Sequence, residues 1–138
     1  MNNKRRLFTA LNILLPLIAG VIVYIFVQKN TYLENVLVGF FAADFKPLIW
    51  SGWTYTFTVC WLCDILWAYS LTFSLWMVLC SWKNAVLFSA VLAFVAGAAF
   101  ELLQLFEVMG GTFDVFDVVL ELMAASLAAV VIKRRKYI

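Results

Sequence analysis

The chain has 138 residues, of which 66% are hydrophobic and 13% are charged, and its formal net charge is +2. A soluble globular protein of this length has too little interior to bury so much apolar surface, so the composition excludes that class. It indicates an integral membrane protein with one domain, residues 1–138. Seven of the ten basic residues lie near the two ends, which is typical of residues that anchor and orient membrane helices rather than of a nucleic-acid-binding surface.

The first apolar run, at 7–27, is long enough to cross a hydrocarbon core of about 30 Å. It starts like a signal peptide, but it is longer than the usual apolar part and no clear cleavage site follows. We therefore expect an uncleaved helix with a kink near Pro16. Residues 28–58 include helical spacing at 31–41 and then a run rich in Trp and Tyr, which favour the headgroup level. We expect an external connection along the interface with one short amphipathic helix.

Three further spans are expected, at 59–80, 85–106 and 114–132. Four crossings put both termini on one side of the membrane, and the positive-inside rule places them in the cytoplasm together with Lys83. The external turn at 107–117 then carries acidic residues and no basic residue. The sequence therefore predicts an all-α fold, a polytopic bundle of four transmembrane helices with an interfacial external segment.

Two helical faces that carry both small residues and acids are expected to meet. The first repeats every four positions and consists of Ser89, Ala93, Gly97 and Glu101. Gln104 extends this face by three residues. The second face, in the last span, consists of Asp114, Asp117, Glu121, Ala124, Ala125 and Ala128. Because small residues let helices approach closely in lipid, we expect the acids to gather just below the outer membrane surface.

Ionisable groups inside an apolar span cost about 2.5–3.5 kcal/mol each on insertion scales and normally mark a pathway or a site. Asp64 and Trp67 share a helical face at a similar depth, where Asp64 either caps the helix or joins the acidic pocket. The predicted ligand- or cation-binding residues are Glu101, Gln104, Asp114, Asp117, Glu121, Asp64 and Trp67. Asp114 and Asp117 also have a structural explanation as acids at a helix start, which does not extend to Glu121.

The apolar spans contain no Lys, Arg or His that could pair with these acids. Four interpretations follow: neutral carboxyls that only bond helix to helix, protonated carboxyls, a bound cation, or the polar or amino part of a ligand. Calcium or magnesium suits oxygen ligands, so a divalent cation is one candidate cofactor, and no other is indicated.

Sequence motifs for catalysis are missing. Cys60 and Cys63 have C-x-x-C spacing, but no thioredoxin-like pattern accompanies them, which favours packing over redox chemistry. The chain contains no histidine, no nucleotide-binding glycine loop and no serine elbow. Since no nucleophile or base is singled out, an enzymatic function is not favoured.

The string Glu101-Leu-Leu-Gln104, followed by Gly111-Thr-Phe-Asp114-Val-Phe-Asp117, resembles the VanZ-like family of small bacterial membrane proteins. That family shows E-x-x-Q at the end of one helix and D-x-x-D at the start of the next. Glu121 and Ala124 stand where it usually has Asn and Gly. Asp64-Ile-Leu-Trp67-Ala-Tyr69 looks like a divergent form of its earlier D-K-x-x-H-F motif, without the Lys and His. The resemblance implies a four-helix protein of the bacterial cytoplasmic (inner) membrane, and the founding member is linked to teicoplanin resistance.

Three functions remain as hypotheses. The leading one is a VanZ-like envelope protein whose acidic pocket opens towards the outer leaflet and binds a lipid headgroup, a cell-wall precursor or a glycopeptide, with a role in antibiotic resistance. The second is a small proton- or cation-coupled transporter in which the acids form a relay. The third is an interaction subunit of a larger membrane complex, bound through the Ala and Gly faces. The lipid bilayer is the expected partner in each case, and all three are compatible with an oligomer.

Overall fold

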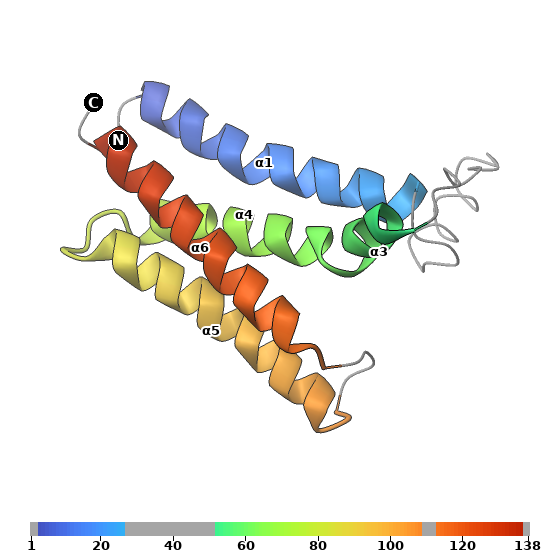
Figure 1. The fold of residues 1–138 in the computed structure, drawn as a ribbon. Coiled ribbons are helices and arrows are strands. Elements are labelled where there is room, and N and C mark those ends of the chain that lie inside the picture. Colours follow the sequence, from blue (N-terminus) through green and yellow to red (C-terminus); the bar gives the residue numbers. More distant parts are fainter. Residues whose placement is uncertain (1–2, 27–51, 109–112, 137–138) are drawn as a thin grey trace.

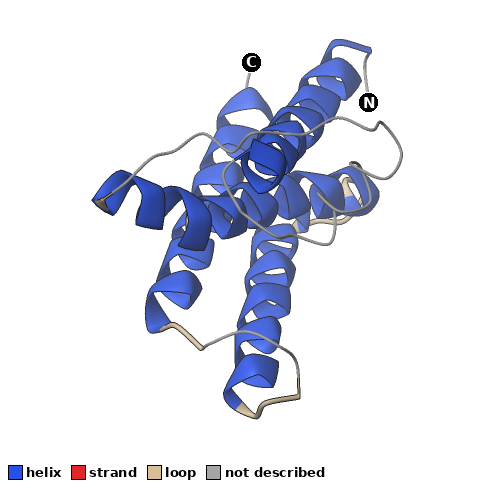
Figure 2. Cartoon of the chain, turned by 90° about the vertical axis from the view of Figure 1, so that its right-hand side faces the viewer, coloured by secondary structure: helices blue, strands red, loops and turns tan. Residues whose placement is uncertain are grey.

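The structure is a computed structural model, and it describes residues 3–26, 52–108 and 113–136. Within these ranges the chain forms helices joined by turns, without strands (Figure 2). In chain order the helices are α1 (Asn3–Phe26), α3 (Trp53–Cys60), α4 (Leu62–Leu79), α5 (Ala85–Leu105) and α6 (Val115–Lys136). The predicted all-α class is confirmed for this part of the chain.

Four helical stretches are long and apolar enough to cross a membrane: Asn3–Val23, Trp53–Leu79, Ala85–Leu105 and Val115–Arg135. They correspond to the four predicted spans, so a multi-pass membrane protein is confirmed at that level. The first helix starts at Asn3, so its first turns include the basic residues at 4–6. It also continues through Pro16 as a single helix (Figure 1).

The second span differs from the prediction because it is built from two helices. Trp61 separates α3 from α4, with φ −120° and ψ −30°, and Figure 1 shows α3 turned away from the direction of α4. The helix therefore starts at 53, inside the segment predicted as an external connection, and breaks after the predicted span start at 59. Residues 27–51, including the predicted helical spacing at 31–41, lie outside the described residues.

Helix α4 is the centre of the arrangement, because it packs against α1, α3, α5 and α6. Helices α5 and α6 also pack against each other, and in Figure 1 they run together away from α1. The start of α1 lies beside the end of α6, where the Arg135 guanidinium stands 4.8 Å from the centre of the Phe8 ring. The described chain therefore begins and ends at the same end of the bundle.

Small side chains fill much of the interior, whereas large apolar side chains point outwards. Ala68, Ala93 and Ala128 are fully buried, while Leu87 and Leu127 are more than half exposed. This distribution reverses that of a soluble protein and suits lipid, which solvates large apolar groups while small residues allow close helix contact. A buried hydrophobic cluster, Phe73 with Ala128 and Ile132, joins α4 to α6 near the basic ends of α1 and α6.

Polar contacts link α1 to α4. The Tyr69 hydroxyl donates to Asn12 Oδ1 at 2.7 Å, and the Ser70 hydroxyl donates to the carbonyl oxygen of Ile13 at 2.8 Å. Interhelical hydrogen bonds in membrane proteins contribute about 0.6 kcal/mol each on average. These two bonds therefore fix how α1 is placed on α4 more than they add stability.

Candidate functional site

The two predicted faces of small and acidic residues do meet. On α5 the buried residues are Ala85, Ser89, Ala93, Gly97 and Glu101. On α6 they include Asp117, Glu121, Ala124, Ala125 and Ala128. Because α5 packs against α6, carboxyls from both helices lie at their shared interface. We call the end of the bundle that holds Glu101, Asp117 and Asp64 the acidic end.

The closest approach of α5 and α6 at the acidic end involves Gly97 and Glu121. A Cβ added to Gly97 would overlap the Glu121 carboxyl group, so that carboxyl packs directly on the backbone of α5. Any larger residue at position 97 would need this carboxyl to move. Gly97 therefore provides the space in which a buried acid of the next helix is held.

Asp114 organises the start of α6. Its Oδ1 accepts a hydrogen bond from the Phe116 amide at 2.9 Å, and its backbone amide donates to Glu101 Oε2 at 3.1 Å. Its Oδ2 accepts a hydrogen bond from the Trp61 indole at 3.4 Å. The carboxyl is thus engaged as a helix cap, in the manner predicted for a helix-start acid. The predicted turn at 110–112 lies outside the described residues.

Trp61 belongs to this site although the sequence did not single it out as a site residue. It connects the break between α3 and α4 to the start of α6, and its ring lies 6.1 Å from that of Phe116. Its partner Asp114 is 53 residues away in the chain. The aromatic run around Trp61 indicates an interface position, but no spacing in the sequence signals such a distant contact.

Asp117 and Glu121 are the two carboxyls that local structure does not satisfy. Their residues are 9% and 4% exposed, and one oxygen of each, Asp117 Oδ1 and Glu121 Oε2, is buried without a hydrogen-bond partner among the described residues. Asp117 and Glu121 both lie near enough to Asp64 and Glu101 to interact electrostatically. A buried polar atom without a partner is destabilising, and a buried charge more so. These two oxygens are therefore the open positions of the site.

The basic side chains of the described residues cannot pair with these acids. They lie in the first turns of α1, in the loop at 80–84 and in the last turns of α6, at the other end of the bundle. We call this the basic end. Charge is thus separated along the helices, as the sequence predicted.

Asp64 and Trp67 lie on α4, beside a groove between α4 and α1. Asp64 is in the first turn of α4. Together with Trp67 it lines a groove of about 320 Å³ between α1 and α4, whose other walls are mainly apolar: Pro16, Leu17, Gly20, Val21, Cys63 and Leu66. Trp67 also packs edge-on against Phe100 of α5, with ring centres 6.0 Å apart. The groove therefore combines mainly apolar walls from α1 and α4 with one acidic side chain.

Gln104 and Glu107 lie at the margin of the acidic site. Gln104 is half-buried one turn beyond Glu101, and no hydrogen bond joins it to the carboxyls of the described residues. Glu107 is exposed after the end of α5, with φ +55°. The structure thus brings together Glu101, Asp114, Asp117 and Glu121 with Asp64 nearby, and it leaves Gln104 at the margin.

The described residues also bear on metal and redox chemistry. In them, no three Asp, Glu or Cys side chains converge as a set that could hold one metal ion, so the divalent cation stays a prediction. Cys60, Cys63 and Cys80 are free thiols. Cys60 and Cys63 therefore form no disulfide.

Comparison with protein-family models, curated proteins and solved structures gives no match to this chain. The resemblance to the VanZ-like family rests on the motif residues alone. Functional inference must therefore start from the acidic site itself.

Proposed function

We propose that this multi-pass membrane protein binds a polar ligand of the cell envelope through the acidic site. Support comes chiefly from the two buried oxygens, Asp117 Oδ1 and Glu121 Oε2, that have no hydrogen-bond partner in the part of the chain that the structure describes. Carboxylates accept hydrogen bonds and attract positive charge. The complementary ligand therefore carries an amine, hydroxyls or amides, or it binds through a cation.

The groove beside Asp64 narrows the choice of ligand. Its walls are mainly apolar, and they include the carboxyl of Asp64, which interacts electrostatically with Glu101. An amphiphile with an acyl chain could place the chain in this groove and direct its polar head towards the acids. This arrangement favours a lipid headgroup or a lipid-linked cell-wall precursor over a small soluble ligand.

The proposed setting is the bacterial cytoplasmic membrane, with both termini in the cytoplasm. In that orientation the acidic end faces the outer leaflet, because the basic end follows the positive-inside rule. Cell-wall precursors and glycopeptides act on that side. A role in glycopeptide resistance, as the VanZ-like motif residues imply, fits an outward-facing ligand site.

Lipid binding tests the proposal directly. The purified protein would be titrated with phosphatidylethanolamine, whose headgroup carries an amine, and bound lipid counted by native mass spectrometry. The double variant Asp117→Asn/Glu121→Gln is expected to lose at least about tenfold in affinity, since each hydrogen bond to a charged group contributes about 1.5–3 kcal/mol. Glu107→Gln is the matched control, because it removes an exposed acid at the same end. Equal binding by all three proteins would contradict the proposal.

Resistance is a separate readout. Cells that express the wild-type protein are expected to tolerate more teicoplanin than cells that express Asp117→Asn/Glu121→Gln at the same level. If lipid binding changes but drug sensitivity does not, the site binds an envelope lipid without a resistance role. Unchanged results in both assays would leave the carboxyls as structural groups.

A proton or cation relay is the second candidate function, and the interior gives it less support. Away from the acids, the buried polar side chains include Ser89 and Thr72. Both donate to carbonyl oxygens of their own helices, at 2.6 and 2.9 Å. Flux of protons or cations into liposomes that is abolished by Glu101→Gln would favour the relay over ligand binding.

A further inference from the structure

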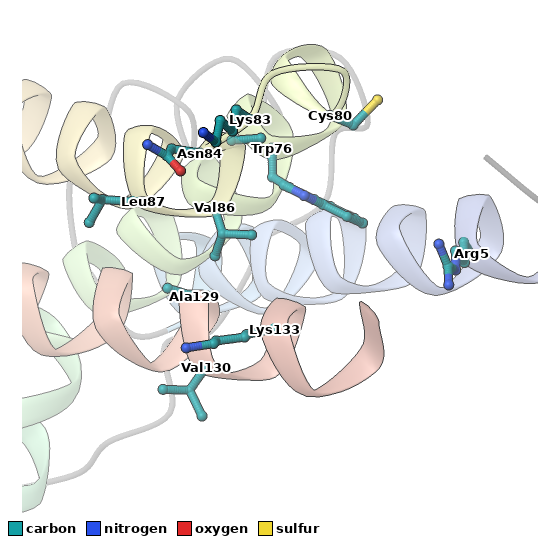
Figure 3. A pocket seen from close by; sticks show the side chains of 11 residues that line it. Arg5, Trp76, Cys80, Lys83, Asn84, Val86, Leu87, Ala129, Val130 and Lys133 are labelled. Carbon is teal, nitrogen blue, oxygen red and sulfur yellow. The ribbon is translucent and has the colours of Figure 1, made fainter. Parts of the chain in front are cut away.

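A cavity of about 610 Å³ opens at the basic end, away from the acidic site (Figure 3). Its walls come from α1, the end of α4, the loop at 80–84, the start of α5 and the end of α6. Three of its lining residues are cationic: Arg5, Lys83 and Lys133. Among the described residues, none that lines the cavity is acidic. Three separate segments therefore bring positive charge to one hollow.

The two lysines are not neutralised by neighbours. Neither Lys83 nor Lys133 forms an ion pair within the part of the chain that the structure describes. Each is an exposed residue that lines the cavity, so its ammonium group can reach a ligand. An anion in the cavity would thus meet charges that are otherwise balanced only by solvent.

The first turn of α5 adds donors at the same place. Ala85, Val86 and Leu87 line the cavity, and Asn84 before them makes no side-chain capping bond. The amide of Ala85 donates to the carbonyl oxygen of Trp82 at 3.3 Å, so the donors left at this helix start are the amides of Val86 and Leu87. The first amides of a helix have no partner inside the helix, and the helix dipole favours an anion there. This helix start supports the lysines in selecting negative charge.

We propose that this cavity binds the phosphate group of an anionic phospholipid. The charged part suits a phosphate, which accepts hydrogen bonds from lysines and helix amides. Other parts of the wall, which include Trp76, Val86 and Val130, are apolar and belong to helices long enough to cross a membrane. They offer a surface for an acyl chain, which a free phosphate ion would leave unfilled.

The position of the cavity along the helices agrees with a headgroup. Trp76 lines it, and Trp82, 60% exposed, lies in the adjoining loop. Tryptophan is enriched at the membrane–water interface, the level of lipid phosphates. Juxtamembrane basic residues gather anionic lipid in general. This cavity differs from a diffuse basic surface because two lysines and the start of α5 line the same space.

The test measures lipid selectivity in the purified full chain. Phosphatidylglycerol and phosphatidylcholine would be titrated separately, with bound lipid counted by native mass spectrometry. We expect tighter binding of phosphatidylglycerol, reduced about fivefold by Lys83→Gln or Lys133→Gln and about 25-fold by both, because each basic residue contributes about 1 kcal/mol. The control is Lys4→Gln/Arg134→Gln, which removes the same charge from residues that do not line the cavity.

Several outcomes decide the matter. An equal loss in the control would overturn the proposal, because it would mean diffuse attraction by surface charge. Equal binding of both lipids by the wild-type protein would overturn it as well. Ala129→Phe, which fills the cavity without changing charge, should weaken phosphatidylglycerol binding in a protein with unchanged helical circular dichroism. Displacement of phosphatidylglycerol by equimolar inorganic phosphate would contradict the assignment to lipid and indicate a soluble anion.

Discussion

Gly97→Ala should reveal how tightly the buried acid of α6 is held. The added methyl group occupies the space of the Glu121 carboxyl, so that the side chain or the helices must move. Overpacking a filled interior costs about 1–3 kcal/mol. Replacing glycine by alanine inside a helix returns up to about 1 kcal/mol. We therefore expect Gly97→Ala to destabilise the wild-type protein by about 1–2 kcal/mol.

The same substitution should change sign once the carboxyl is gone. In a Glu121→Ala background the space is empty, so the methyl group is accommodated and only the helix preference remains. Gly97→Ala is then expected to stabilise by about 0.5–1 kcal/mol. The two effects together give a coupling energy of about 2 kcal/mol, within the range for residues in direct contact.

Unfolding by sodium dodecyl sulfate in mixed micelles, followed by tryptophan fluorescence and circular dichroism, measures each corner of the cycle. Gly20→Ala is the control, because a Cβ at Gly20 meets nothing within 4 Å. It should have the same small effect with and without Glu121. If Gly97→Ala changes stability equally in both backgrounds, the Glu121 carboxyl does not pack on α5 and the geometry of the acidic site is refuted.

Three further predictions concern other parts of the chain. Asp114→Ala should destabilise by about 1–2 kcal/mol in the same unfolding assay, because α6 loses its capping bond, whereas Asp114→Asn should retain most of the stability. Phe73→Ala should cost about 3–5 kcal/mol in that assay, since Phe73 is fully buried, while Phe106→Ala, at an exposed ring, should cost little. A membrane-impermeant maleimide added to intact cells should label the exposed thiol of Cys60 and spare that of Cys80, which lies at the basic end; labelling of Cys80 alone would reverse the proposed orientation.

The helical architecture could be predicted because it depends on short-range patterns. Long apolar runs determine the spans, and the four-residue spacing from Ser89 to Glu101 places small residues on one face whatever the neighbours are. The partner face followed from the same reasoning, since Ala124 and Ala128 continue the line of Glu121. Because both α5 and α6 carry small residues on these faces, close packing of the two helices was the favoured arrangement in lipid.

Contacts between distant segments could not be predicted in the same way. The indole of Trp61 reaches Asp114 because the chain breaks between α3 and α4, and a break within a continuous aromatic run has no glycine or proline to signal it. Likewise, the positive-inside rule puts Lys83 and Lys133 on one side of a membrane. It does not say that they line one cavity, which depends on how α4, α5 and α6 cross.

The two acids at the start of α6 differ in how their carboxyl groups are engaged, which the sequence does not show. Asp114 and Asp117 both looked like helix-start residues, but only Asp114 has its carboxyl engaged as a cap. Asp117 lies one turn further on the face that packs inside the bundle, and its Oδ1 has no hydrogen-bond partner within the described ranges. Spacing from a helix start identifies both positions, whereas the direction of the α6 axis decides which carboxyl becomes buried.

Glu121 is the residue that best separates ligand binding from structure. Asp64 and Asp117 lie in the first turns of their helices, where the dipole favours an acid. Glu101 accepts a hydrogen bond from the Asp114 amide, so its loss would disturb the turn between helices. Glu121 has neither explanation, and Glu121→Gln preserves its shape in the space beside Gly97. A ligand-binding role therefore predicts that Glu121→Gln folds normally and binds ligand poorly. If the carboxyl is purely structural, folding and ligand binding should change together or not at all.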